Sequence, residues 1–142
     1  MKAINPNEIK DNFIELIGKE WMLVSAGDKE KFNMMTASWG GVGVLWNRPV
    51  VFAFIRPERY TREFIDAKND KVAATGLTPF FTEAGNPAFE EARLTLECKV
   101  VYKSEIEEAK FLDPSVFPRW YDEKNGNAHI VYIAEIVNAW EK

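Results

Sequence analysis

The sequence predicts a mainly β protein, an all-β barrel with two or three peripheral helices. Residues 93–102 alternate between apolar and polar side chains, as a half-buried strand does. Residues 50–55 and 129–140 are apolar on both faces over much of their length, which is typical of buried strands. The chain has neither a βαβ rhythm nor an internal repeat. We therefore expect five or six strands, most of them antiparallel to their neighbours.

Length and composition indicate one domain covering residues 1–142, large enough to bury a real core. The net charge of −4 argues against nucleic acid or an anionic membrane as a partner. Cys98 is the single cysteine, so an internal disulfide is excluded and a reducing compartment is favoured. The N-terminus has no apolar leader, and no apolar run approaches the length of a membrane span. We predict a soluble cytoplasmic protein.

The first elements are a helix and two strands. The helix is predicted from Pro6 to Ile17, with Asn5 as its N-cap, an apolar face, and Gly18 at its end. Two short β-prone runs follow, Trp21 to Ser25 and Phe32 to Trp39. A Gly-Asp break between them predicts two antiparallel strands with a loose connection.

A glycine-rich segment follows the second strand. Three glycines within Gly40 to Gly43 predict close backbone approach or positive φ in a loop, not a regular element. Val50 to Ile55 is bracketed by Pro49 and Pro57 too tightly for a helix, so a strand is predicted. Thr61 to Lys68 then fits a short helix with Thr61 as its N-cap.

The second half is dominated by two long strands. Arg93 to Tyr102 is the clearest strand, and it places Cys98 on the apolar side as an inert buried thiol. A short helix is predicted for Glu105 to Leu112, ended by the prolines that follow. Asp122 to Asn127 fits a turn-rich surface loop, and His129 to Trp140 is predicted to be the final strand.

The first candidate site lies at the end of the second strand, at Thr36, Ala37, Ser38 and Trp39. Small residues there allow a planar ring to lie against the backbone, where hydroxyls and N–H groups can bond ring heteroatoms. The alternative is a polar edge strand that leads into glycines. Taken alone, these four residues favour this alternative, because short motifs often match by chance.

The second candidate is a basic turn that contains Arg56, Arg59, Tyr60 and Thr61. A guanidinium fork suits a phosphate, and hydroxyl and N–H groups at a helix start add donors. A solvated basic turn with an N-cap explains the same residues equally well. Both interpretations stay open.

A third candidate is the corner at Trp46 and Asn47, which could supply an aromatic wall and a polar contact. A core tryptophan before a turn is the more common alternative. His129 has no Cys or His neighbours at metal-ligand spacing, so no metal site is predicted and a structural role is favoured. The nucleophile, phosphate-loop and dinucleotide motifs are missing, so no catalytic side chain is predicted.

The run TASWGGVGVLWNRPVVFAFIRPERYT resembles the flavin reductase-like family, FMN-binding split-barrel proteins that include flavoredoxin. Three later blocks are similar to that family in the right order: FEEARLTLECKVVY, WYDEK and HIVYIAEIV. The resemblance implies a six-stranded antiparallel Greek-key split barrel, usually a homodimer with FMN near the subunit interface. It places the flavin ring and ribityl chain along residues 36–39, with residues 46 and 47 in the adjoining loop. The phosphate falls to Arg56, Arg59, Tyr60 and Thr61.

The function predicted from this resemblance is an NAD(P)H-dependent flavin reductase that passes hydride to FMN N5 and electrons onward. The acceptor could be free flavin, iron or a redox partner protein. An alternative is a flavoredoxin-like FMN electron carrier without its own nicotinamide site. The family implies a longer segment where Asp70 here runs almost directly into Val72 to Leu77, which favours the carrier. The third alternative is a β-barrel binding module that has lost the flavin.

Overall fold

The structure is a computed structural model that describes residues 1–59 and 75–142. The predicted helix from Thr61 to Lys68 and the short segment after Asp70 lie outside the described residues. The side chain of Arg59 is likewise not described.

The described residues are mainly β, as predicted. The strands are β1 (Lys2–Ile4), β2 (Met22–Gly27), β3 (Phe32–Ala37), β4 (Gly40–Leu45), β5 (Arg48–Ile55), β6 (Pro79–Phe81), β7 (Pro87–Phe89), β8 (Leu94–Glu105) and β9 (Ile130–Glu141). The helical turns are η1 (Pro6–Glu8), α1 (Phe13–Glu15), η2 (Leu16–Glu20), η3 (Pro57–Arg59), η4 (Glu108–Lys110) and α4 (Val116–Trp120).

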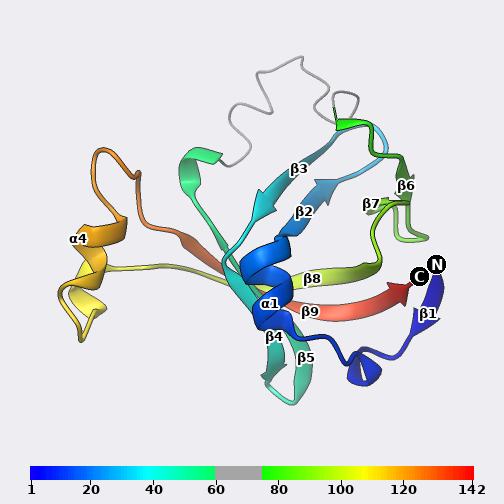
Figure 1. The fold of residues 1–142 in the computed structure, drawn as a ribbon, viewed down its shortest axis with the longest axis horizontal. Helices are drawn as coiled ribbons and strands as arrows, with labels where there is room; N and C mark the ends of the chain where they lie inside the picture. The colour runs from blue at the N-terminus through cyan, green and yellow to red at the C-terminus, as the bar shows by residue number, and fades with distance from the viewer. Residues whose placement is uncertain (60–74) are drawn as a thin grey trace.

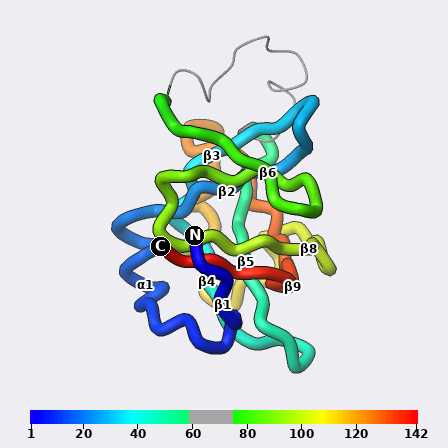
Figure 2. The backbone as a smooth tube through the Cα atoms, turned by 90° about the vertical axis from the view of Figure 1, so that its right-hand side faces the viewer, coloured from blue at the N-terminus to red at the C-terminus, as the bar shows by residue number. Residues whose placement is uncertain are grey.

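Strand β9 is the centre of the largest sheet (Figure 1). One edge of β9 pairs along its length with β8, and the other edge is shared by β5 and β1. Strand β4 adds beyond β5, and every pairing is antiparallel. Because Lys2 pairs with Glu141, the two ends of the chain lie side by side, which is visible in Figure 2. The predicted final strand is confirmed as this central element.

Two smaller sheets, β2–β3 and β6–β7, pack against each other above the large one. The Ser25 hydroxyl of β2 donates to the carbonyl oxygen of Pro87 in β7 at 2.7 Å. The Phe32 and Phe81 rings meet edge to face at 5.4 Å. The strands remain in three sheets and do not close into one barrel within the described residues. The expected count of six Greek-key strands is therefore not confirmed.

Many buried apolar residues lie along the paired strands β5 and β9, and a further buried cluster of Met34 and Phe89 lies in the smaller sheets. Val50 is fully buried. The buried members of these two strands are Val50, Ala53, Ile55, Ile133, Ala134, Ile136 and Ala139. Burial of these side chains is the main term that holds the large sheet together.

The predicted helix from Pro6 to Ile17 is wrong, because the segment is broken into η1 and α1 with an extended stretch between them. The Asn5 side chain accepts from the Asn7 N–H at 3.0 Å, so the predicted cap is confirmed. The Asn12 side chain then accepts from the Glu15 N–H at 3.4 Å and starts a second helix. Asparagine competes with a continuing helix in this way, which a count of apolar spacing does not capture.

The predicted glycine loop from Gly40 to Gly43 is also wrong, because these residues belong to β4 and pair with β5. The expectation of close backbone approach is confirmed at Gly40. A Cβ atom there would lie 2.5 Å from the Phe52 carbonyl oxygen and 2.8 Å from Cε of Met22. Glycine at this position therefore lets β4 come close to both β5 and β2.

The predicted alternation along β8 holds only in part, because β-bulges lie between residues 97 and 98 and between residues 100 and 102. Glu97, expected on the polar side, is only 6% exposed, because the β6–β7 hairpin covers that side of β8. Its carboxylate accepts hydrogen bonds from three neutral side chains, Thr82, Asn86 and Asn138. Burial raises the pKa of the neighbouring Cys98 thiol to about 12, which agrees with the expected inert thiol.

The segment between β8 and β9 differs from the prediction of a helix from Glu105 to Leu112. Strand β8 continues through Glu105, and a single 3-10 turn, η4, follows it. The unpredicted helix α4 contains Pro118 in its first turn, where proline is tolerated because its missing N–H has no helical partner. Residues 122–127 form the expected turn-rich loop, closed by a bridge between Asp122 and Gly126.

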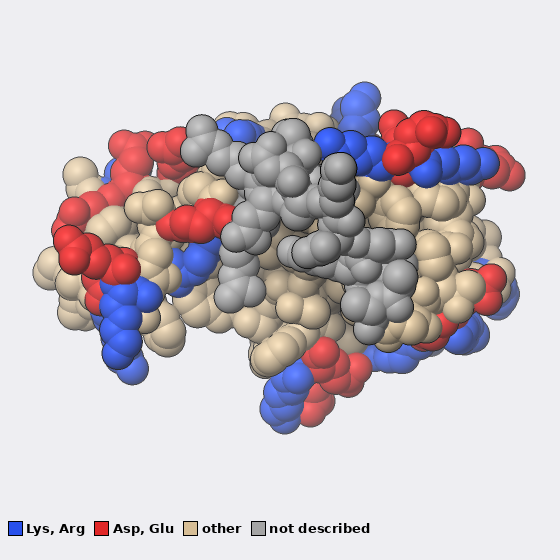
Figure 3. Space-filling view, turned by 90° about the horizontal axis from the view of Figure 1, so that it is seen from above, with Lys and Arg blue, Asp and Glu red and all other residues tan. Residues whose placement is uncertain are grey.

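The surface carries charges of both signs. In Figure 3, basic and acidic residues are interspersed around the rim of the face that is shown. None of the helices in the described part of the chain is long and apolar enough to span a membrane.

Candidate functional site

The predicted ring-binding residues lie where β3 leads into β4. Thr36 and Ala37 end β3, and Ser38 and Trp39 form the short link to β4. The Thr36 side chain is exposed, Ala37 is buried, and Trp39 is 38% exposed. This link therefore presents a hydroxyl and an indole beside the bare backbone of Gly40.

Trp39 packs against residues from the far end of the chain. Its ring lies edge to face with Trp120 of α4 at 5.3 Å between centroids, and at 4.9 Å from the His129 ring. His129 is 7% exposed, whereas Trp120 is 43% exposed. The two indoles thus combine a packed side with a side open to solvent, which suits a flat aromatic ligand.

Tyr121 completes this cluster. Its hydroxyl lies 3.0 Å from Nδ1 of His129, and the two rings are 5.6 Å apart. Burial raises the pKa of Tyr121, and the positive charge of Arg56 acts in the opposite direction. The hydroxyl is therefore protonated at neutral pH. We call Trp39, Trp120, Tyr121 and His129 the aromatic wall.

Arg56, at the end of β5, contacts the aromatic wall. Its Nη1 donates to the carbonyl oxygen of Asn127 at 3.0 Å, and its Nη2 donates to that of Trp120 at 3.2 Å. The guanidinium carbon lies 5.4 Å from the centre of the Tyr121 ring. These contacts place the predicted phosphate corner next to the predicted ring ledge.

Glu58, one turn after Arg56, holds the same loop. Its Oε1 accepts from the backbone N–H of Asn127 at 2.5 Å. This hydrogen bond lowers the pKa of Glu58, and the nearby charge of Arg56 lowers it further. Gly126 has φ +91°, and a Cβ atom there would lie 3.3 Å from both Arg56 and Glu58. Glycine thus allows the loop to approach both side chains.

Trp46 and Asn47 lie at the other end of the β4–β5 hairpin. They form a two-residue turn with φ of 51° and 57°, closed by the pair Leu45 and Arg48, which fits a type I′ turn. Asn adopts this left-handed conformation readily, but a bulky Trp does so at a cost in energy. Trp46 is 56% exposed, so the alternative of a core tryptophan is wrong.

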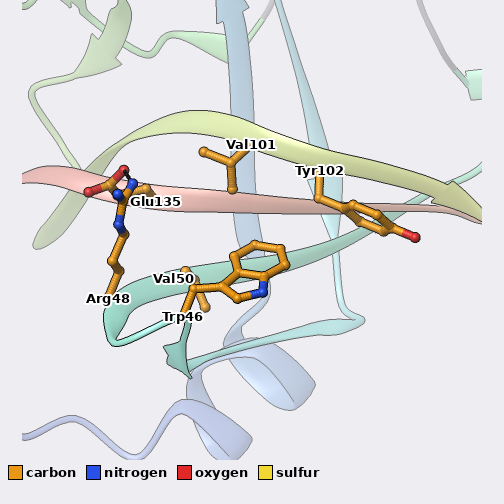
Figure 4. A pocket seen from close by; sticks show the side chains of 6 residues that line it. All are labelled: Trp46, Arg48, Val50, Val101, Tyr102 and Glu135. Atoms are coloured by element: carbon orange, nitrogen blue, oxygen red, sulfur yellow. Dashed lines mark hydrogen bonds and ion pairs between the residues drawn. The ribbon is translucent and has the colours of Figure 1, made fainter.

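A shallow groove of about 380 Å³ lies beside this turn (Figure 4). The Trp46 and Tyr102 rings face it at 6.3 Å between centroids, above the buried Val50. At its side, Nη1 of Arg48 lies 2.8 Å from Oε2 of Glu135. The groove is lined by the first residues of β5, whereas Arg56 and the aromatic wall lie at the other end of that strand, so the two are separate.

The structure therefore divides the predicted site residues into three groups. Trp39 and Arg56 both contact the aromatic wall, Thr36, Ala37 and Ser38 directly precede Trp39 in the chain, and Trp46 and Asn47 stand apart. The backbone of Arg59 lies in η3 next to Arg56. Tyr60 and Thr61 lie outside the described residues.

The sequence interpretation missed the roles of Trp120, Tyr121, Glu58 and Asn127. The signal was the block WYDEK, where two aromatics precede a turn-rich loop that leads to His129. His129 is buried and bonded, in keeping with the structural role expected for it.

These residues fit a phosphorylated flavin. Indole faces can pack on the ring, and the hydroxyls of Thr36 and Ser38 can bond its heteroatoms. Arg56 forms no salt bridge among the described residues and uses two of its five N–H donors on backbone carbonyls, which leaves donors for a phosphate. No cluster of three or more His, Cys, Asp or Glu side chains in the described ranges has metal-binding geometry.

Several solved structures have a similar fold. A protein from Shewanella frigidimarina, assigned as a flavin reductase with a split barrel domain, has a TM-score of 0.58 at 20% identity. That likeness covers 96% of this chain and 77% of the other. An FMN-binding protein from Thermus thermophilus, solved with bound 1-cyclohex-2-enone, has a TM-score of 0.56 at 17% identity. This likeness covers 85% of this chain and 69% of the Thermus protein.

Nitrilotriacetate monooxygenase component B from Bacillus cereus has a TM-score of 0.51 at 20% identity, covering 98% of this chain and 81% of that protein. No protein-family model matches the sequence, and no curated protein is a significant match. At these identities the likeness shows a shared fold. The shared fold confirms the resemblance to FMN-binding split-barrel proteins.

Proposed function

The chain has the split-barrel fold of FMN-binding proteins and flavin reductases, and from this premise we propose that it binds FMN and acts as a flavin oxidoreductase. The observation that carries the proposal is the contact between the two halves of the predicted site. Trp39 reaches Arg56 through Trp120, whose ring packs on Trp39 and whose carbonyl oxygen accepts from Arg56.

In the proposed site, the flavin ring and ribityl chain lie along Thr36, Ala37, Ser38 and Trp39. The phosphate is held by Arg56, Arg59, Tyr60 and Thr61. FMN, when bound, supplies the redox chemistry by accepting a hydride at N5 and passing electrons onward. The chain's own groups orient the ring, shield one face of it from water and place donors near its oxygens.

We propose NADH or NADPH as the electron donor. The second candidate is an FMN electron carrier that receives electrons from a redox partner protein. It is favoured by the short link from Asp70 to Val72, where the family implies a longer segment. Steady-state oxidation of NADH and NADPH with added FMN distinguishes the two, because turnover supports a reductase. A protein that binds FMN without turnover supports the carrier.

We further propose a homodimer, because Trp46 and Asn47 stand at the opposite end of β5 from Arg56. An eight-residue strand spans roughly 25 Å, which exceeds the length of one FMN. In a dimer, the Trp46 turn of one copy can approach the aromatic wall of the other. Closure into a six-stranded Greek-key barrel, a single domain over residues 1–142 and a cytoplasmic location belong to the same proposal.

The first experiment is the absorbance spectrum of the purified protein with and without added FMN, followed by fluorescence titration with FMN and riboflavin. We expect saturable binding, with FMN tighter than riboflavin because of the charge-assisted phosphate contacts. Arg56→Ala and Thr61→Ala should each weaken FMN about tenfold and reduce the preference for FMN over riboflavin.

A protein that takes up no FMN would overturn the proposal and support the flavin-less binding module. Full FMN affinity in both variants would show that the phosphate lies elsewhere.

A further inference from the structure

The segment 120–127 carries half of the aromatic wall, and among the described residues its hydrogen bonds to parts of the chain outside α4 go to Arg56, Glu58 and His129. It follows α4, which lies well away from the sheets (Figure 1). Its internal bonds close the loop on itself: the Gly126 N–H donates to the Asp122 carbonyl oxygen at 2.8 Å, and the Asn125 N–H to the Asp122 carboxylate at 2.6 Å. These bonds shape the loop but do not fix it against Trp39.

The attachments to the end of β5 come from Arg56 and Glu58. Arg56 donates to carbonyl oxygens at both ends of the segment, and Glu58 accepts from the Asn127 N–H. The Arg56 guanidinium also lies over the Tyr121 ring. A planar guanidinium can span two carbonyls and stack on a ring together, which a lysine ammonium cannot do.

We propose that Arg56 and Glu58 are positioning residues that clamp the segment 120–127, so that Trp120 and Tyr121 stand against Trp39 and His129. The inference rests on the proposed function in one respect, that the flavin ring lies on this wall. It gives Arg56 a second role beside the phosphate and gives Glu58 a role that the sequence did not indicate.

Glu58 provides a sharp test, because its charge and its clamp role predict opposite changes in FMN affinity when it is removed. As a negative charge near a bound phosphate, Glu58 repels the ligand, so its removal should tighten FMN binding. As a clamp, it orders the wall, so its removal should weaken FMN binding. Glu58→Gln removes the charge but retains an oxygen that can accept from Asn127, whereas Glu58→Ala removes both.

The ligand-free protein tests the clamp first. Trp39 and Trp120 meet edge to face at 5.3 Å, close enough for their indoles to give a coupled circular dichroism signal. We expect Glu58→Ala and Arg56→Lys to reduce this signal while the rest of the spectrum is retained. Arg93→Ala is the matched control, because Arg93 pairs with Asp11 away from the wall. An undiminished signal in both clamp variants would overturn the inference.

FMN titration of the same variants then tests the consequence for binding. We expect about fivefold weaker binding in Glu58→Ala, the equivalent of one lost hydrogen bond, and wild-type or tighter binding in Glu58→Gln. Equal or tighter binding in Glu58→Ala would show that Glu58 acts through charge alone and would contradict the inference. Failure of the wild type to bind FMN would overturn the proposed function, while the circular dichroism result would still decide the clamp.

Discussion

The two ends of the β4–β5 hairpin differ in how the chain surrounds them. At the Gly40 and Arg56 end, Trp120 of α4 and His129, just before β9, pack on the link after β3, and two charged side chains hold the loop between them. At the other end, Trp46 is exposed in a left-handed turn beside an open groove. One end is therefore fixed by contacts within the chain, whereas the other retains an aromatic that the core does not require.

This difference shows how a run of contiguous sequence can misrepresent a site. Residues 36–61 look like one binding motif, yet the β4–β5 hairpin places Trp46 and Asn47 a strand's length away from the other members. The parts that meet do so through residues from the last third of the chain. Variants at each end can test whether the enclosed end is stabilising and whether the open end serves binding.

The largest effect on stability is expected at the enclosed end, from Gly40→Ala. The new Cβ would lie 2.5 Å from a backbone oxygen of Phe52, so β4 or β5 must shift. We expect the free energy of unfolding to fall by about 3 kcal/mol, measured by urea denaturation. Gly41→Ala is the control, because its nearest neighbour is a ring carbon of Phe52 at 3.9 Å. Equal stability of the two variants would refute the close approach at Gly40.

A smaller loss is expected from Tyr121→Phe, which removes the hydroxyl that bonds His129. Loss of this half-buried hydrogen bond should cost about 1 kcal/mol of unfolding free energy. Tyr102→Phe at the open end is the control, because Tyr102 is 47% exposed and should change stability little. If Tyr102→Phe lowered the unfolding free energy as much as Tyr121→Phe, the two ends would not differ in how their tyrosine hydroxyls contribute to stability.

Acid should loosen the enclosed end before the open one. The folded pKa of Glu58 is lowered from 4.5, chiefly by the Asn127 N–H, so its contribution is complete above pH 4.5 and is lost as pH falls through the folded value. Because Glu58 is exposed, the effect is under about 1 kcal/mol. The Trp39–Trp120 circular dichroism signal should decline with a midpoint below pH 4.5. An identical decline in Glu58→Gln would assign the transition to another group.

The smallest effect on stability is expected at the open end, from Trp46→Gly. Glycine relieves the left-handed strain of about 1–2 kcal/mol, while the lost contact with Tyr102 costs a similar amount. Unfolding free energy should therefore change by less than about 1 kcal/mol. If the turn serves a second copy, sedimentation velocity should show weaker dimerisation in this variant. A dimer unchanged in strength would separate Trp46 from the interface.

Much of the fold could be predicted because it follows local patterns. The largely apolar run at residues 129–140 identified β9, and the Asn5 cap was correctly placed. The errors arose where distant partners override local preference. Gly40 is in a strand because β5 pairs with it, and Glu97 is buried because the distant β6–β7 hairpin covers it.

The candidate site was predicted in the same uneven way. The ledge and the arginine corner were visible as residue types, and the structure places Trp39 and Arg56 together. Trp120, Tyr121 and Glu58 were missed because their roles depend on the path of a loop far along the chain. The separation of Trp46 from Arg56 could not be foreseen without the pairing that makes residues 40–55 a hairpin.

The thiol of Cys98 has a practical consequence. Burial raises the pKa of Cys98 to about 12, so the thiol stays un-ionised at the near-neutral pH used for maleimide coupling and should react more slowly than an exposed cysteine. A cysteine introduced on an exposed position such as Leu112 can therefore carry a fluorophore or spin label at one defined point. Distances between that probe and the indoles would then follow the loop in solution without removal of the native residue.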